Sequence, residues 1–132
     1  MSTDWQEDVA EFMRGVGQEV RTVPIGEVID IPVAEERLRV DLTQEELDEF
    51  MAAESITEIA DAIADILYVT VGAACTYGIT LQPIWDEVHR SNMSKLGGEK
   101  RADGKVLKSK NYSPPDIERC LREQGWLGGS SA

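Results

Sequence analysis

The residues with the clearest chemical potential are carboxylates in the middle of the chain. Glu46 and Glu49 are three residues apart and share a face of any helix that contains them. Glu58, Asp61 and Asp65 follow the i, i+3, i+7 spacing of one helical face. Carboxylates held together disfavour each other's ionisation, and a divalent cation removes that conflict. Oxygen ligands favour Mg²⁺, for which Mn²⁺ can substitute, over zinc.

The surroundings of the two aspartates separate a metal site from an ordinary solvated acidic face. Glutamates three residues apart are common on exposed helices, so Glu46 and Glu49 alone fit either interpretation. Asp61 and Asp65 lie among apolar residues, and aspartate is a poor helix former that is rarely buried unpaired. A tight turn near residues 54–55 would make the two acidic segments antiparallel neighbours. Counting outward from it places Glu49 level with Asp61. Glu46 then falls level with Asp65, and a metal site is predicted.

A second informative segment, 94–112, reverses the charge of the acidic region. The chain has 25 acidic and 13 basic residues, a net charge of −12, which argues against a binder of nucleic-acid polymers. Residues 35–65 hold eleven acids. The 94–112 segment holds six bases, Lys95, Lys100, Arg101, Lys105, Lys108 and Lys110. An acidic region and a basic loop in one small domain suit a ligand made of a metal ion and a polyphosphate.

Helices are expected to position both segments. Apolar residues at helical spacing, together with capping residues, predict helices over about 3–20, 35–53, 55–77, from Thr80 onward, and over 113–125. There is no strand-rich region. Residues 1–132 are therefore predicted to form one all-α domain, an antiparallel bundle of four or five helices. Within it, 94–112 is expected to be a basic substrate loop and 126–132 a flexible tail.

The remaining composition indicates a cytoplasmic protein, or one of the host cytoplasm if the source is viral. We find no apolar run of the roughly 18 residues needed to cross a membrane, and the acidic N-terminal segment does not resemble a signal peptide. Cys75 and Cys120 lack the spacing of a zinc or redox motif, and Cys75 is interpreted as a buried thiol. Trp5, Trp85 and Trp126 are interpreted as packing residues.

Four blocks of sequence resemble a known superfamily. Glu45-Glu46-x-x-Glu49, followed by Glu58-x-x-Asp61-x-x-x-Asp65-Ile-Leu-Tyr, resembles the signature of the all-α NTP pyrophosphatases, which include MazG, phosphoribosyl-ATP pyrophosphohydrolase and the dimeric dUTPases. The blocks EIADAIADILYVTVG, EVHRSNMSK and ADGKVLKSKNYSPPDI resemble more closely the MazG-like enzymes of bacteriophages. The resemblance covers about residues 9–121.

This resemblance implies a dimer or tetramer that cleaves a nucleoside triphosphate to the monophosphate and pyrophosphate. The implied metal ligands are Glu46, Glu49 and Asp61, completed by Glu58 or Asp65. The spacer before Glu58 is shorter than in MazG, so either completion remains open. Adjacent Glu45 is the candidate general base. The substrate-binding candidates are Asn92 and Lys95, which match phosphate or sugar contacts of the family, and Lys105, Lys108 and Tyr112, which are expected to close over the nucleotide.

Several specialisations remain open at this point. The phage-type enzymes include dATP/dGTP diphosphohydrolases, which is the preferred interpretation, and a house-cleaning hydrolase of non-standard NTPs is the alternative. Phosphoribosyl-ATP hydrolysis is less favoured because the ADGKVLKSKNY block is foreign to that branch. A different class is a non-enzymatic acidic protein that mimics DNA. Such a mimic has no use for Asp61 and Asp65 in an apolar helix.

Overall fold

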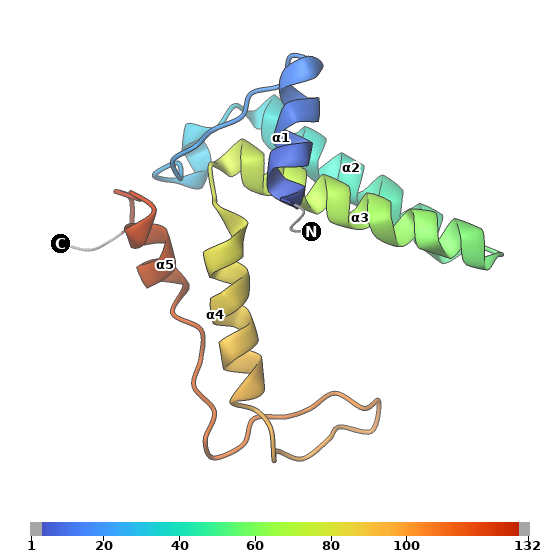
Figure 1. Cartoon of the computed structure of the whole chain (residues 1–132), viewed down its shortest axis with the longest axis vertical. Coiled ribbons are helices and arrows are strands. Elements are labelled where there is room, and N and C mark those ends of the chain that lie inside the picture. The colour runs from blue at the N-terminus through green and yellow to red at the C-terminus, as the bar shows by residue number, and fades with distance from the viewer. Residues whose placement is uncertain (1–3, 130–132) are drawn as a thin grey trace.

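The computed structural model describes residues 4–129 and is all-helical (Figure 1). Its helices are α1 (Trp5–Gly15), α2 (Val33–Ala52), α3 (Ile56–Tyr77), α4 (Leu81–Met93) and α5 (Ile117–Glu123), with a short 3-10 turn, η1, at Val28–Asp30. Across residues 4–129 the β-structure is limited to one isolated antiparallel bridge between Lys100 and Val106. The all-α prediction is confirmed.

Helix α1 begins at Trp5 because the Asp4 side chain accepts a hydrogen bond from the backbone nitrogen of Glu7, at 3.0 Å. The predicted start at Thr3 lies outside the described residues. The helix ends at Gly15, five residues before the expected end, and Gly17 adopts a positive φ of 81° just beyond it. The chain then runs as an irregular connector to α2.

Helix α3 begins and ends where the sequence predicts. Ser55 accepts a hydrogen bond from the backbone nitrogen of Glu58 at 3.1 Å and so caps the first turn. Gly78 ends the helix with a φ of 75°. A side chain there would collide with the carbonyl oxygen of Val23 in the connector. Glycine is therefore required both by conformation and by space.

Helix α3 is the central element, with α2 antiparallel along it and α1 crossing its C-terminal half (Figure 1). The buried contact with α1 is formed by Val9, Ala10, Met13 and Cys75. Cys75 is 1% exposed, which confirms the buried thiol. Within residues 4–129, α3 is long and apolar enough to cross a membrane by length and composition alone, so the sequence expectation of no such segment was wrong. Its packing and its three acidic residues instead fit the core helix of a globular domain.

A buried arginine fixes the spacing of these three helices. Arg39 on α2 is 6% exposed and donates a hydrogen bond to the Gln18 side chain at 3.1 Å. Its guanidinium fills the space beside Gly72, where a β-carbon would lie 2.3 Å from Nη1. Burial lowers the pKa of Arg39. The absence of a side chain at Gly72 on α3 thus leaves the space that the Arg39 guanidinium of α2 occupies.

Helices α4 and α5 form a second pair that extends away from the other three (Figure 1). Glu87 on α4 is only 7% exposed and connects the pair. It accepts two hydrogen bonds from Arg90, at 2.9 and 2.8 Å, and one from the backbone nitrogen of Asp116 at 2.7 Å. Arg119 of α5 lies 3.3 Å from it. These donors lower the pKa of Glu87 to about 2, with Arg90 the largest cause.

Two glutamine side chains hold the bend between α3 and α4 through hydrogen bonds to its backbone. The Gln6 side chain donates to the Ile79 carbonyl at 2.6 Å and accepts from the Leu81 nitrogen at 2.8 Å. Gln124, after α5, makes the equivalent pair with the backbone of Thr80, at 2.8 and 2.9 Å. The bend is therefore held from α1 on one side and from α5 on the other.

The three tryptophans have different environments. Trp126 donates its indole N–H to the Gly26 carbonyl at 3.0 Å and lies under the Arg122 guanidinium, as a packing residue should. Gly129 contacts Glu27 through a 3.0 Å hydrogen bond, so the described part of the predicted flexible tail is attached to the connector. Residues 130–132 lie outside the described range. Trp5 and Trp85 are 58% and 66% exposed, which contradicts their interpretation as packing residues.

Candidate functional site

Three carboxylates from α2 and α3 converge where the two helices run side by side. One oxygen each from Glu46, Glu49 and Asp65 lies within 4.8 Å of the others, a group compact enough to hold a metal ion. Glu46 and Glu49 are one turn apart on α2, and Asp65 faces them from α3. The register counted outward from the turn near residues 54–55 placed Glu46 level with Asp65, and the structure brings these two together. We call this group the carboxylate triad.

Glu46 is the most unusual member of the triad. Its Oε2 atom is buried and has no hydrogen-bond partner among the described residues. The pKa of Glu46 is raised to about 7, first by burial, then by the adjoining Glu49 carboxylate and by the charges of Asp65 and Asp61. The pKa of Asp65 is also raised, by burial and then by Asp61 and Glu49. A buried, unpartnered acceptor that resists ionisation is the environment that a bound cation would relieve.

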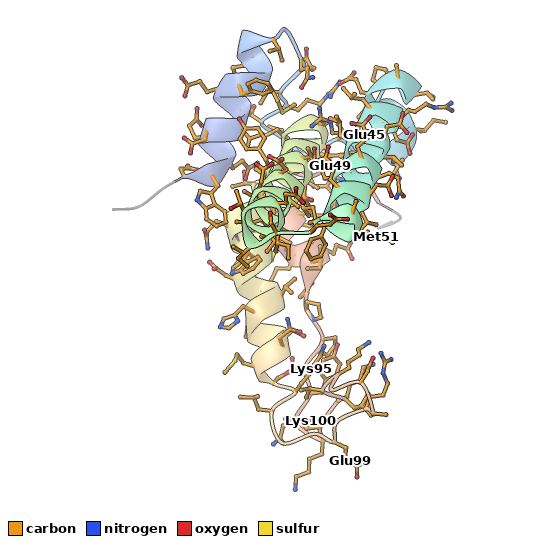
Figure 2. All side chains as sticks on the ribbon, turned by 90° about the vertical axis from the view of Figure 1, so that its right-hand side faces the viewer. Glu45, Glu49, Met51, Lys95, Glu99 and Lys100 are labelled. Atoms are coloured by element: carbon orange, nitrogen blue, oxygen red, sulfur yellow. The ribbon has the colours of Figure 1, made fainter. Side chains whose placement is uncertain are left out.

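The other predicted acids occupy different places. Asp61 is exposed and lies outside the triad, although its charge acts on both Glu46 and Asp65. Glu58 accepts a hydrogen bond from the backbone nitrogen of Glu54 at 2.7 Å, so its carboxylate caps the start of α3. Glu45 is exposed on α2, one turn before Glu49 (Figure 2). Of the two completions left open by the sequence, this geometry favours Asp65 over Glu58, and it does not bring Asp61 into the group.

The basic segment is a hairpin-like loop at the far end of α4. Its two sides are joined by backbone hydrogen bonds from Arg101 to Lys105 and from Leu107 to Glu99, both 2.7 Å. Ser94 attaches the loop to α4, because its hydroxyl accepts from the Ser113 nitrogen at 2.8 Å. The loop borders an open hollow of about 560 Å³.

Part of the predicted substrate set gathers on this loop. The ammonium groups of Lys95 and Lys108 lie 5.9 and 5.0 Å from the centre of the Tyr112 ring. Lys105 and Asn92 are exposed and are not drawn into that group. Tyr112 therefore lies near two cations from opposite ends of the loop.

The triad and the basic loop are separated within one chain. Figure 2 places Lys95 and Lys100 at the opposite end of α4 from the α2–α3 pair, which carries Glu45 and Glu49. The expectation that the loop closes over the carboxylates is therefore not met within a single copy.

Sequence reasoning also missed how many apolar side chains stay uncovered. Near the tip of the α2–α3 hairpin, Phe50, Met51, Ile56 and Ile63 are 41%, 77%, 79% and 48% exposed. The helical periodicity predicted α2 and α3 correctly but not the burial of these side chains, because periodicity does not distinguish an intramolecular contact from an intermolecular one.

Comparison with known proteins agrees with this geometry. A family model described as phosphoribosyl-ATP pyrophosphohydrolase matches residues 9–92, which contain the triad and end before the basic loop. An uncharacterised protein, L479, from Acanthamoeba polyphaga mimivirus is 38% identical over 76 residues, or 55% of this chain. The aligned part is 30% of that viral protein, so the chain spans much less than its full length.

The family model covers well over half of the chain, including the acidic motif and the helices that carry it. Members of this family are pyrophosphohydrolases. The chain belongs to the phosphoribosyl-ATP pyrophosphohydrolase family, within the MazG-like superfamily of all-α NTP pyrophosphatases.

Proposed function

We propose that this protein is a Mg²⁺-dependent nucleoside triphosphate pyrophosphohydrolase. The reaction adds water to the α-phosphorus and breaks the bond between that phosphorus and the oxygen bridging to the β-phosphate. The products are a nucleoside monophosphate and pyrophosphate. The observation that carries the proposal is the buried, unpartnered Oε2 of Glu46 within a group of three carboxylates.

The triad fits a hard divalent cation. Its donors are all carboxylate oxygens, which suit Mg²⁺ or Mn²⁺ rather than zinc. Glu46, Glu49 and Asp65 would hold the ion, with Asp61 adjacent to them. When bound, the ion supplies charge neutralisation for the triphosphate and lowers the pKa of a coordinated water.

The residues of the chain have distinct tasks in this scheme. Glu45, exposed and one turn from Glu49, would accept the proton that the attacking water loses. Lys95 and Lys108, held beside Tyr112, would bind the negatively charged phosphates. Asn92 and Lys105 are each three residues in sequence from one of these lysines, and we assign them to the sugar or the phosphates.

A second copy of the chain would bring these groups together. The hairpin tip exposes Phe50, Met51 and Ile56, more apolar surface than a monomeric helical hairpin normally leaves in water. The basic loop and the carboxylates have opposite charge and are too far apart to meet within one copy (Figure 2). A homodimer or homotetramer in which one copy's loop faces its partner's triad satisfies both requirements.

Mixing two inactive variants tests the shared site. Asp65→Asn and Lys108→Ala each disable one half of it. If each site combines halves from two copies of a dimer, random mixing after reversible dissociation should restore about a quarter of the wild-type activity. Mixing Asp65→Asn with Glu49→Gln is the matched control and should restore none, because both changes lie in the same half. Equal recovery in both mixtures, or none in either, would contradict a shared site.

We favour dATP and dGTP as substrates within this reaction class, with a role in phage nucleotide metabolism. The similarity to a viral protein is consistent with this choice. Removal of non-standard NTPs is the alternative within the class. Phosphoribosyl-ATP belongs in any substrate panel, because the family model bears its name.

A product-resolved assay tests the reaction itself. The eight standard NTPs and dNTPs, together with phosphoribosyl-ATP, are offered with Mg²⁺ or Mn²⁺, and the products are separated by chromatography. Monophosphate plus pyrophosphate is the expected outcome. Release of inorganic phosphate alone would assign a different reaction. Absence of turnover together with a melting temperature that ignores Mn²⁺ would favour an acidic interaction protein.

A further inference from the structure

A second cavity lies in the groove between α1 and α3. It has a volume of about 290 Å³ and is lined mainly by apolar side chains. Trp5 from α1 and Tyr68 from α3 contribute aromatic rings, Leu67 and Val71 contribute aliphatic surface, and Asp8 contributes the acidic group. Apolar walls with a single well-placed polar group are typical of sites that recognise a small ligand.

The groove and the triad both use residues of helix α3. Tyr68 is three residues from Asp65 on α3 and therefore one turn away on an adjoining strip of the helix. Ala64, also in the lining, directly precedes Asp65. A ligand whose phosphates lie at the triad would need only its sugar to reach from Asp65 to Tyr68. The cavity is small, which suits a single base rather than a larger group.

The aromatic rings are available for stacking. Trp5 and Tyr68 are 58% and 39% exposed. Phe12 touches Tyr68 edge-on, with ring centres 5.9 Å apart and an interplanar angle of 73°. This contact supports the tyrosine ring without covering it by a parallel one. Flat, partly uncovered rings beside a phosphate site are what a nucleobase stacks on.

Asp8 supplies the selectivity of the groove. Its side chain takes part in none of the hydrogen bonds or ion pairs found within residues 4–129. A carboxylate has only acceptors and pairs with adjacent N–H donors. Guanine presents two such donors on one edge, the ring N1–H and the 2-amino group, whereas adenine presents an amino group beside an acceptor nitrogen. A second copy of this chain is a poorer occupant, because it would bury the Asp8 charge without a cation.

We propose that the α1–α3 groove is the base subsite, that Trp5 and Tyr68 stack on the base, and that Asp8 makes guanine the preferred base of the two purines favoured above. This inference rests on the proposed function, because the triad places the phosphates. It gives Asp8 a role that the acidic motif does not contain and that no metal requires.

The first test compares dGTP with dITP, which differs by the absence of the 2-amino group. The wild-type kcat/KM should favour dGTP by about tenfold, the value of a hydrogen bond to a charged group. Asp8→Asn should bring the two substrates to near equality. Glu11→Gln, an exposed acid on the same helix, is the matched control and should keep the wild-type ratio. An unchanged ratio in Asp8→Asn, in an active enzyme, overturns the selection role while leaving the proposed function intact.

A second test examines stacking. Trp5→Ala should raise KM for all four bases by about fivefold or more, and Trp5→Phe should recover most of that loss. Size-exclusion chromatography accompanies both variants. A change in the oligomeric state with unchanged KM would show that a second copy, rather than a base, covers the groove, and would overturn the proposal.

Direct binding separates this inference from the reaction. Quenching of tryptophan fluorescence by dGMP, in EDTA, requires no turnover and no metal. Quenching that disappears in Trp5→Phe and weakens in Asp8→Asn supports the groove even if no triphosphate is hydrolysed. No binding of dGMP by the wild type would overturn the base subsite whatever the activity assay returns.

Discussion

Two glutamates, one in each half of the molecule, are largely withdrawn from solvent and have opposite environments. Glu87, between α4 and α5, receives hydrogen bonds from Arg90 and from the backbone of Asp116, and its pKa falls to about 2. Glu46, between α2 and α3, has a buried oxygen without a partner, and its pKa rises to about 7. Where the chain supplies hydrogen-bond donors, as around Glu87, the glutamate side chain joins two structural elements. Where the chain supplies none, as at Glu46, the carboxylate is open to the metal ion that we propose.

The largest expected effect comes from removing a charge of the triad. Asp65→Asn should lower kcat/KM by at least about 100-fold, the upper range for disturbing even the supports of a metal site. Circular dichroism should show unchanged helix content, because an amide fits the same space. Asp48→Asn, which removes an exposed carboxylate of α2 outside the triad, is the control and should retain wild-type activity. Wild-type activity in Asp65→Asn would mean that the triad is not the metal site.

Metal binding should be visible as stability. Mn²⁺ at 100 times its dissociation constant should add about 2.7 kcal/mol to the free energy of unfolding. Urea melts with and without Mn²⁺ measure this difference. Asp65→Asn should lose most of the gain, whereas Glu87→Gln should retain it. An equal response in all three proteins would place the ion elsewhere.

The pH dependence of the metal-free protein sharpens the contrast. The folded-state pKa of Glu46, about 7, lies above the ordinary value of 4.5. Its contribution to stability is therefore fully present below pH 4.5 and is lost as the pH rises through 7. Urea melts in EDTA between pH 5 and 8 should show declining stability, and Glu46→Gln should flatten that decline. Increasing stability over this range in the wild type, absent from Glu46→Gln, would reverse the assigned sign.

For Glu87 we expect the opposite slope of stability against pH, and the smallest effect of the four predictions. Because its folded-state pKa lies below 4.5, its contribution is present above that pH and is lost as the pH falls from about 4.5 to about 2. Acid unfolding followed by tryptophan fluorescence should show this loss. Glu87→Gln should be less stable at neutral pH and nearly insensitive to pH in that window. A variant with the wild-type acid profile would exclude Glu87 as its source.

Sequence patterns were most informative where interactions are local. The capping residues of α3 and its C-terminal glycine are determined within one turn of chain, so Ser55 and Gly78 were predictable. The approach of Glu46 to Asp65 followed from counting turns away from a short link. The Ser55/Glu58 spacing also predicted that Glu58 would cap its own helix, but it left Glu58 open as a metal ligand as well, because a helix-terminal carboxylate has two competing uses.

Long-range placement was not readable from the sequence. Nothing in the pattern around Trp5 or Asp8 indicated that α1 would lie against α3 and form a groove, because α1 reaches α3 across more than fifty residues of chain. The hydrogen bond from Trp126 to Gly26 joins residues 100 positions apart, and the sequence pattern did not indicate it either. The direction of α4 depends on side chains contributed by α1 and by the segment after α5.

The hydrogen bonds of the two glutamines to the bend between α3 and α4 have a consequence for how the protein can evolve. The short link at 78–80 has few hydrogen bonds of its own, so the angle of α4 is encoded by Gln6 and Gln124, one near each terminus. Substitutions at either position would swing the basic loop through an arc while leaving every charged residue unchanged. In the oligomer that we propose, such variants would alter which neighbouring copy the loop reaches, and hence the symmetry of the assembly, without any mutation at an interface or at the site itself.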